Sequence, residues 1–153
     1  MNILISLGSR KLRNGNNNPK NYPYAKELVK LLRKQDHNVI QARGNDDPIL
    51  GADEVETDLP LKKLAEVITG CHLFISVDSF IQHYCTYLGK RGIVIFSRSD
   101  PLIFGYPQNV NLLKSRDLLR PWQFGTWEED TFTEEAFVRP EVVMDALKSF
   151  KFF

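Results

Sequence analysis

The 153-residue sequence lacks the features that mark membrane-spanning, secreted or metal-binding proteins. No apolar run approaches the roughly 20 residues that a membrane helix needs. The first residues, MNILISLGSRK, carry no basic segment before their short apolar run, so they predict a strand rather than a signal peptide. Two cysteines, Cys71 and Cys85, are too few for a disulfide framework or a cysteine-rich metal site. We therefore expect a reduced, cytoplasmic protein with no membrane span, metal or cofactor.

Strong net charge is also missing, but the charge that is present is unevenly distributed. The net charge is +1, whereas residues 1–43 carry nine Lys or Arg against two acids, and residues 44–70 carry two lysines against seven acids. A basic first quarter could attract phosphate or nucleic acid; alternatively, most of these cations lie on a solvated helix face. Nucleic acid is the less expected partner, because its binding needs a denser basic stripe with interleaved aromatic side chains.

Short apolar runs alternate with segments of helical periodicity along the chain. The expected strands are residues 2–7, 38–42, 73–77 and 92–96, with a weak strand at 109–113. The expected helices are residues 24–34, 59–68, 79–88 and 140–150, the last with Val142, Val143, Ala146 and Leu147 as its apolar stripe. Strands that are apolar on both faces are typical of a parallel sheet covered by helices on both sides. The predicted fold class is α/β, a single three-layer Rossmann-like sandwich with a mostly parallel sheet.

Polar segments separate these elements. RKLRNGNNNPKN, which follows the first strand, cannot bury itself and predicts a loop, as does the acidic segment GNDDPILGADEVETD after the second. Asp58 is a candidate N-cap for the second helix, and Gly70 and Gly89 are candidate helix ends.

Three strand ends carry residues suited to ligand binding, because ligands of open parallel sheets bind beyond the carboxyl ends of the strands. They are Gly8-Ser9-Arg10-Lys11, continued by Lys20; Gly44-Asn45-Asp46-Asp47; and Asp78-Ser79. The first suits either a phosphate site or a simple turn. The second suits a surface loop better than a site.

The third strand end is the most specific of the three. Ser79 opens a helix whose first amides can hold phosphate through hydrogen bonds and the helix dipole. Asp78 would repel phosphate, so it must face sugar hydroxyls, or one of the two side chains simply caps the helix. His83 lies one turn further along the same face. A lone histidine there is more often packed than catalytic, and no nucleophile, base or second metal-binding histidine accompanies it.

The segment from Leu61 to Pro107 resembles the donor-binding half of GT-B glycosyltransferases and is most similar to the lipopolysaccharide heptosyltransferase family. The matching pieces are LKKLAEVITGCHLFISVDSFIQHYCTYLGKRGIVIF and SRSDP. Upstream, LGSR and KNYPYAKELVKLL look like the family's phosphate-contacting strand end and its Lys-x-Trp-Pro helix start, with Tyr22 in place of Trp. The resemblance covers about two thirds of the chain and implies a fold equivalent to one half of a GT-B enzyme.

This resemblance implies a nucleotide-sugar site. Ser79 and the amides after it would hold the diphosphate, and Asp78 would face the sugar. Phosphate contacts would come from Ser9, Arg10 and Lys20, and the strand end at Gly44 would lie beside the ribose and base.

The sequence also departs from the family pattern. Phe80 stands where the family has a glycine, and Arg98 adds a cation to the Ser-Asp-Pro turn, where it is a further candidate phosphate contact. With His83, these residues complete the expected substrate-binding set, while no catalytic residue can be assigned.

Three functional hypotheses remain open. Because a complete GT-B enzyme has two Rossmann-like domains, the first is a donor half that gains its acceptor half from a partner or from a second copy of the chain. The second is a non-catalytic nucleotide or nucleotide-sugar binding module with a regulatory role, of a size that suits a phage gene. The third and weakest is a nucleoside-processing enzyme that uses Asp78 or glutamates of the 128–135 region.

The segment 101–139 is irregular and rich in aromatic residues. With the C-terminus it contains Trp122, Phe124, Trp127, Phe132, Phe137, Phe150, Phe152 and Phe153. These are too many for a free extension, so they either wrap the domain's own sheet, cover the surface of a missing domain or form a homo-oligomer.

Overall fold

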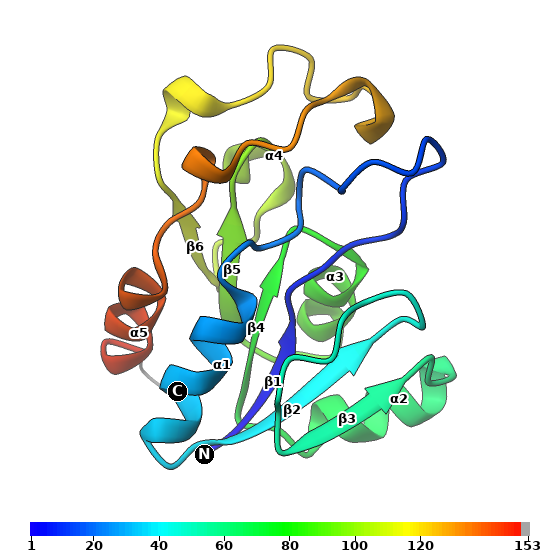
Figure 1. The fold of residues 1–153 in the computed structure, drawn as a ribbon. Helices are drawn as coiled ribbons and strands as arrows, with labels where there is room; N and C mark the ends of the chain where they lie inside the picture. The colour runs from blue at the N-terminus through cyan, green and yellow to red at the C-terminus, as the bar shows by residue number, and fades with distance from the viewer. Residues whose placement is uncertain (151–153) are drawn as a thin grey trace.

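A six-stranded sheet, parallel throughout, forms the centre of the computed structural model, which describes residues 1–150 (Figure 1). Its strands are β1 (Asn2–Ser6), β2 (Asn38–Arg43), β3 (Glu54–Thr57), β4 (Leu73–Val77), β5 (Gly92–Phe96) and β6 (Val110–Leu113), in the spatial order β3-β2-β1-β4-β5-β6. All five neighbouring pairs are parallel. The predicted Rossmann-like α/β class is confirmed, including the weak strand that became β6.

Helices cover both faces of the sheet. On one face, α1 (Ala25–Lys34) packs beside α5 (Pro140–Lys148), and on the other lie α2 (Leu61–Thr69) and α3 (Phe80–Tyr87) (Figure 1). The short α4 (Pro101–Phe104) and three 3-10 turns, Arg116–Leu118, Trp127–Glu129 and Glu134–Ala136, lie in the irregular segment after β5.

Two hydrophobic cores follow from the alternation of side chains along the strands. Ile3, Ile5 and Ile75 face α1 and α5, whereas Leu4 and Phe74 face α2 and α3. Every residue of β4 and β5 is buried, as expected for strands covered on both sides. This burial explains why LFISV and GIVIF are continuous apolar runs.

The strand order determines where along the sheet a ligand is expected to bind. From β1 the chain continues through β2 to β3 on one side, and β4 then pairs with the opposite edge of β1 and starts the other half. A crevice forms beyond the carboxyl ends of two strands at such a reversal of order. The residues after β1, Leu7 to Ser9, therefore lie opposite Asp78 and Ser79, which follow β4.

The crossover between β2 and β3 lacks a helix. Parallel strands are usually joined by a crossover helix, but residues 44–53, between β2 and β3, form a loop without a helix (Figure 1). Gln41 of β2 holds this loop in place: its side-chain amide donates to the Pro48 carbonyl at 2.8 Å, and its oxygen accepts from the Leu50 amide at 3.1 Å. A buried polar side chain thus satisfies backbone groups that a helix would have satisfied itself.

Some local expectations were wrong. The acidic segment expected to be only a loop contains β3, an edge strand in which Val55 is the only apolar residue. Asp58 does not cap α2, because it takes a left-handed backbone with φ of 49° and the N-cap position is Pro60. In α5 the predicted stripe holds for Val143, Ala146 and Leu147, but Val142 is 43% exposed and Met144 is buried instead.

The asparagine-rich loop after β1 is more buried than its composition predicted. Leu12 and Asn18 are buried. The Asn18 side chain donates to the Arg10 carbonyl at 2.8 Å and accepts from the Lys20 amide at 3.0 Å. The loop is therefore held by its own amide side chains, and this fixes Arg10 and Lys20 relative to each other.

The aromatic residues of the C-terminal third divide between core and surface. Phe137 is buried in the α1-side core against Tyr22, and Phe132 and Phe150 pack against the same core. Trp122 and Phe124 are 67% and 68% exposed. Phe152 and Phe153 lie outside the described residues. The segment thus wraps the domain's own sheet in part and leaves some aromatic surface exposed.

Within residues 1–150, no helix is long and apolar enough to cross a membrane. The same residues hold no group of three or more His, Cys, Asp or Glu side chains arranged to bind a metal ion.

Candidate nucleotide-sugar site

A large cavity lies at the carboxyl ends of β1, β2 and β4, where the strand order predicts a ligand. This central cavity has a volume of about 680 Å³, within the usual range for small-molecule sites. Seven of the nine predicted substrate-binding residues line it: Ser9, Arg10, Lys20, Gly44, Ser79, Phe80 and His83. The other two, Asp78 and Arg98, do not.

Ser79 and the start of α3 form one wall of the central cavity. Ser79 occupies the N-cap position in an extended conformation, but its side chain makes no capping hydrogen bond. Its Oγ is buried and has no hydrogen-bond partner among the described residues. The expectation that Ser79 or Asp78 caps the helix is therefore wrong, and the first amides of α3 remain available to an anion.

Asp78 is buried below the cavity and bound on both carboxylate oxygens. Oδ1 accepts from Gln82 Nε2 at 2.9 Å, and Oδ2 accepts from Ser99 Oγ at 2.8 Å. These bonds join the end of β4 to α3 and to the turn after β5. Asp78 is thus placed to position Ser79 and the helix start, and it is not among the residues that line the cavity.

His83 reaches the cavity from the second turn of α3. Its Nδ1 lies 2.8 Å from the hydroxyl of Tyr106, and its Nε2 lies 4.0 Å from Asp78 Oδ1. The imidazole is therefore held in one orientation while its side chain stays 45% exposed. It can contact a ligand as a hydrogen-bonding group.

The loop after β1 supplies the cations that line the cavity, Arg10, Lys11 and Lys20. The Ser9 amide donates to Asn21 Oδ1 at 2.8 Å, which fixes the strand end. Lys20 is partly buried, and this burial lowers the pKa of its ammonium, while the charge of Asp78 acts in the opposite direction. A partly desolvated ammonium and free helix amides thus face one cavity, an arrangement suited to phosphate.

The irregular segment contributes Trp127 to the cavity wall and Glu128 beside it, and the sequence assigned neither of them to the nucleotide-sugar site. Trp127 lines the cavity, and its ring centroid lies 4.9 Å from Lys20 Nζ and 3.9 Å from the Arg120 guanidinium carbon. Glu128 binds Arg10 through both carboxylate oxygens. Only the aromatic richness of this segment could have drawn attention to Trp127.

Arg98 lies away from the cavity. Its guanidinium binds Asp130 at 2.7 and 3.1 Å and the Leu118 carbonyl at 2.8 Å. It therefore anchors the segment that carries Trp127 to the turn after β5.

A sequence profile of glycosyltransferase family 9 (heptosyltransferase) matches residues 16–118, more than half of the chain. The chain belongs to glycosyltransferase family 9. No curated protein matches the sequence.

Solved structures of glycosyltransferases share this fold. The family 9 glycosyl transferase from Veillonella parvula DSM 2008 has a TM-score of 0.69 at 17% identity, over 97% of this chain and 45% of that one. ADP-heptose lipopolysaccharide heptosyltransferase II of E. coli has a TM-score of 0.66 at 14% identity, over 97% and 45% of the two chains. E. coli heptosyltransferase WaaC, solved with ADP, has a TM-score of 0.55 at 22% identity, over 71% and 36%. This family 9 chain spans less than half the length of each of these structures, as expected for one half of a GT-B fold.

Within this family 9 domain, the profile ends before Trp127 and Glu128 and begins after Arg10. The clasp formed by Arg10, Lys20, Trp127 and Glu128 is therefore built largely from residues outside the matched segment.

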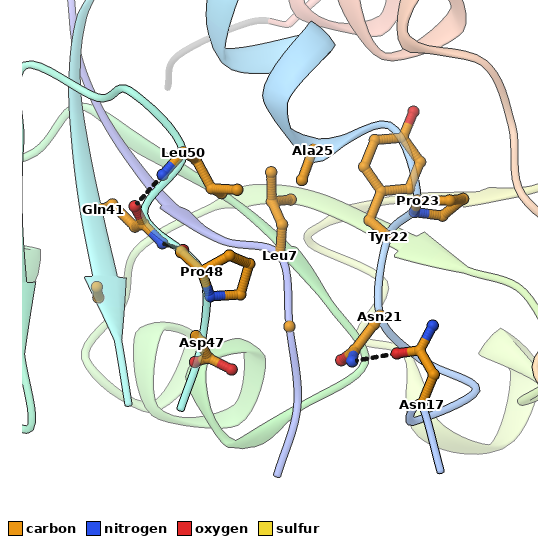
Figure 2. Close-up of a pocket in the computed structure, with 12 residues that line it drawn as sticks. Leu7, Asn17, Asn21, Tyr22, Pro23, Ala25, Gln41, Asp47, Pro48 and Leu50 are labelled. Carbon is orange, nitrogen blue, oxygen red and sulfur yellow. Dashed lines mark hydrogen bonds between the residues drawn. The ribbon is translucent and has the colours of Figure 1, made fainter. Parts of the chain in front are cut away.

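Two smaller cavities adjoin the central one. The α2-side cavity is lined by apolar residues of α2 and by Phe80, with Arg43, Glu56 and Asp58 among its polar groups. The α1-side cavity lies between the residues that lead into α1 and the loop after β2 (Figure 2). It shares Gly8 and Asp47 with the central cavity.

Proposed function

We propose that this family 9 domain binds a nucleoside-diphosphate sugar in the central cavity as the donor half of a glycosyltransferase. The observation that carries the proposal is the uncapped N-terminus of α3, where Ser79 Oγ has no partner within residues 1–150, in a cavity that Lys20 also lines. Free helix amides and an ammonium in one cavity are the groups that bind a diphosphate. The relatives support this choice, since WaaC was solved with ADP and heptosyltransferase II is described as acting with ADP-heptose.

The proposed roles follow from the position of each residue. Ser79, Ser9 and the α3 amides bind the diphosphate with Lys20, and Arg10 joins them when Glu128 releases it. Phe80, which is 56% exposed, offers an aromatic surface beside Gly44 for the nucleoside end. His83 donates or accepts one hydrogen bond from its fixed position.

Sugar transfer requires an acceptor half from a partner or a second copy. The length of the relatives supports this requirement, because this chain covers 45% or less of each. The same observation favours a second candidate function, a module that binds the nucleotide sugar without turnover. The nucleoside-processing hypothesis has less support, because Asp78 and Glu128 are both engaged by neighbouring side chains.

Ligand-induced thermal shifts test the donor site. ADP, UDP, GDP and CMP, each alone and as a nucleotide sugar, are added to the protein; a bound ligand at one hundred times its Kd stabilises by about 2.7 kcal/mol. Lys20→Gln should weaken binding by roughly ten- to a hundredfold, because a charge-assisted hydrogen bond is lost. The matched control is Lys26→Gln on the exposed side of α1. If no nucleotide shifts the unfolding temperature, the donor-site proposal is wrong.

Turnover separates the two candidate functions. Release of free nucleoside diphosphate from a bound nucleotide sugar is measured for the chain alone and with added candidate acceptor proteins. Release under either condition favours the transferase half, whereas tight binding without release under all conditions favours the binding module.

A further inference from the structure

The α1-side cavity exists because the crossover between β2 and β3 has no helix. The loop that replaces the helix, residues 44–53, packs against the core through Leu50 and the partly buried Ala52. Between this loop and the start of α1 a space of about 240 Å³ remains, with Leu7 at its back and Pro23 and Pro48 on either side (Figure 2). This volume suits one ring rather than a whole nucleotide.

The cavity joins the central cavity at Gly8. A Cβ atom at Gly8 would lie 3.1 Å from Asp47 Oδ1 and 3.5 Å from Asn21 Oδ1, so any side chain here would narrow the passage. The absence of a side chain keeps the two spaces continuous. A ligand with its diphosphate beside Ser9 can therefore extend one end into the α1-side cavity.

The lining of the cavity favours a saturated, hydroxylated ring. Its floor is aliphatic, and its one aromatic side chain, Tyr22, is 4% exposed and packs edge-on against Tyr24 and Phe137. A planar base would thus find no open aromatic face. At the rim, Asp47 Oδ1 and the Asn17 amide nitrogen make no hydrogen bond within the described residues, while Asp47 Oδ2 accepts from the Gly44 amide. One free acceptor and one free donor above an aliphatic floor match the hydroxyls and C–H face of a sugar.

The α2-side cavity, unlike the α1-side cavity, offers an exposed aromatic ring. It contains the exposed ring of Phe80 and apolar residues of α2, and it adjoins the central cavity from the opposite face of the sheet. A base stacks on an aromatic ring more favourably than on aliphatic groups. The two side cavities therefore suit the two ends of one ligand.

We propose that the α1-side cavity is a sugar subsite, which takes the sugar ring of the nucleoside-diphosphate sugar while the diphosphate occupies the central cavity. This assignment rests on the proposed donor function and adds the place of the sugar to it. The selectivity of the domain for a sugar nucleotide over a plain nucleotide then comes from the rim of this cavity and from the missing crossover helix.

The test compares nucleotides with and without their sugar. Dissociation constants are measured by calorimetry for ADP, UDP and GDP and for ADP-glucose, UDP-glucose and GDP-glucose. In Ala25→Leu, a larger side chain at the first residue of α1 fills the cavity, and leucine is also a good helix former. Asn17→Ala removes the rim donor at an exposed position, together with the hydrogen bond that Asn17 Oδ1 accepts from Asn21. Ala65→Leu on α2 is the matched control.

We expect the wild type to bind the glucose conjugate more tightly than its nucleotide. Ala25→Leu should abolish this preference, Asn17→Ala should reduce it about fivefold, and both variants should keep the wild-type affinity for the plain nucleotide. The subsite is wrong, with the donor site intact, if the wild type shows no preference or if both variants retain it. It is also wrong if both variants weaken plain nucleotide and conjugate equally. Failure to bind any of the six ligands would instead overturn the donor site itself.

Discussion

Glu128 holds Arg10 at the mouth of the central cavity through two parallel hydrogen bonds. Arg10 Nη1 lies 2.9 Å from Oε1 and Nη2 lies 3.2 Å from Oε2, and the residues are 118 positions apart in the sequence. A carboxylate thus occupies the guanidinium that a phosphate would otherwise bind. The domain carries its own competing anion beside the proposed diphosphate site.

Removing this competing charge should strengthen anion binding. In Glu128→Gln, Arg10 is released from its ion pair and becomes available to phosphate, so the affinity for the best-binding nucleoside diphosphate should rise about two- to fivefold, the range of an exposed ion pair. Calorimetric titration measures the change. The double variant Arg10→Gln/Glu128→Gln should lose the gain. Weaker binding in Glu128→Gln would show that the carboxylate supports the site instead.

The same pair predicts an acid-dependent loss of stability. Hydrogen bonds from Arg10 lower the pKa of Glu128 from its ordinary value of 4.5 to about 2. Because the folded pKa is depressed, the pair stabilises the fold above pH 4.5, and this contribution is lost as the pH falls towards 2. The difference in unfolding free energy between wild type and Glu128→Gln, measured in urea, should therefore be present at pH 6 and vanish near pH 2. A difference that is constant over this range would contradict the depressed pKa.

Tyr22→Phe should destabilise the fold. The Tyr22 hydroxyl donates to the Val138 carbonyl at 2.9 Å in a buried position. Phenylalanine has no hydroxyl, so the Val138 carbonyl would lose this hydrogen bond. We expect a loss of about 1–2 kcal/mol in the free energy of unfolding, measured by urea denaturation. Tyr87→Phe, at a residue that is 84% exposed, is the matched control and should be neutral.

Gly92→Ala should be among the most damaging single substitutions in the sheet. A Cβ at Gly92 would lie 2.4 Å from the Phe74 carbonyl oxygen and 2.5 Å from the Phe74 ring, which is fully buried between the sheet and the helices of that face. Neither atom can move without displacing β4, so we expect a loss of about 3 kcal/mol or more. Gly70→Ala, where the nearest atoms are at 3.6 Å, should be tolerated. Equal melting temperatures for the two variants would refute this close packing.

The two thiols should be protected in the native protein. Burial raises the pKa of Cys85 to about 12 and also raises that of Cys71. Both cysteines are free and buried, and the reactive thiolate form is thus scarce and inaccessible. A thiol reagent at pH 8 should react only at the rate of unfolding, and fully in urea. Rapid stoichiometric labelling of the native protein would be the opposite result.

The sheet and the ligand-binding edge could be predicted because they depend on local patterns. LFISV and GIVIF are apolar on both faces, and a parallel sheet places the residues after its strands at one edge, so Ser9, Gly44 and Ser79 were expected together. β3 could not be predicted, because an edge strand such as EVET needs few apolar residues.

The partners of the site residues depend on distant sequence. Asp78 was expected to face a ligand or cap a helix, but it binds Ser99, 21 residues away, and no local pattern specifies that bond. Trp127 reaches Lys20 through a segment without periodicity. The α1-side cavity arises from a helix that is missing, and a polar loop in the sequence does not show how much of the sheet it leaves uncovered.

The position of β1 has a consequence for synthesis on the ribosome. β1 is made before the other elements of this domain, but it needs β4, whose residues Leu73–Val77 are made later, to complete its second edge. Its α1-side face also waits for α5, residues Pro140–Lys148. The nascent chain therefore carries an apolar strand with one open edge until β4 has been made, which is the kind of surface that chaperones bind. We expect the domain to acquire its stable fold only after the last helix has emerged.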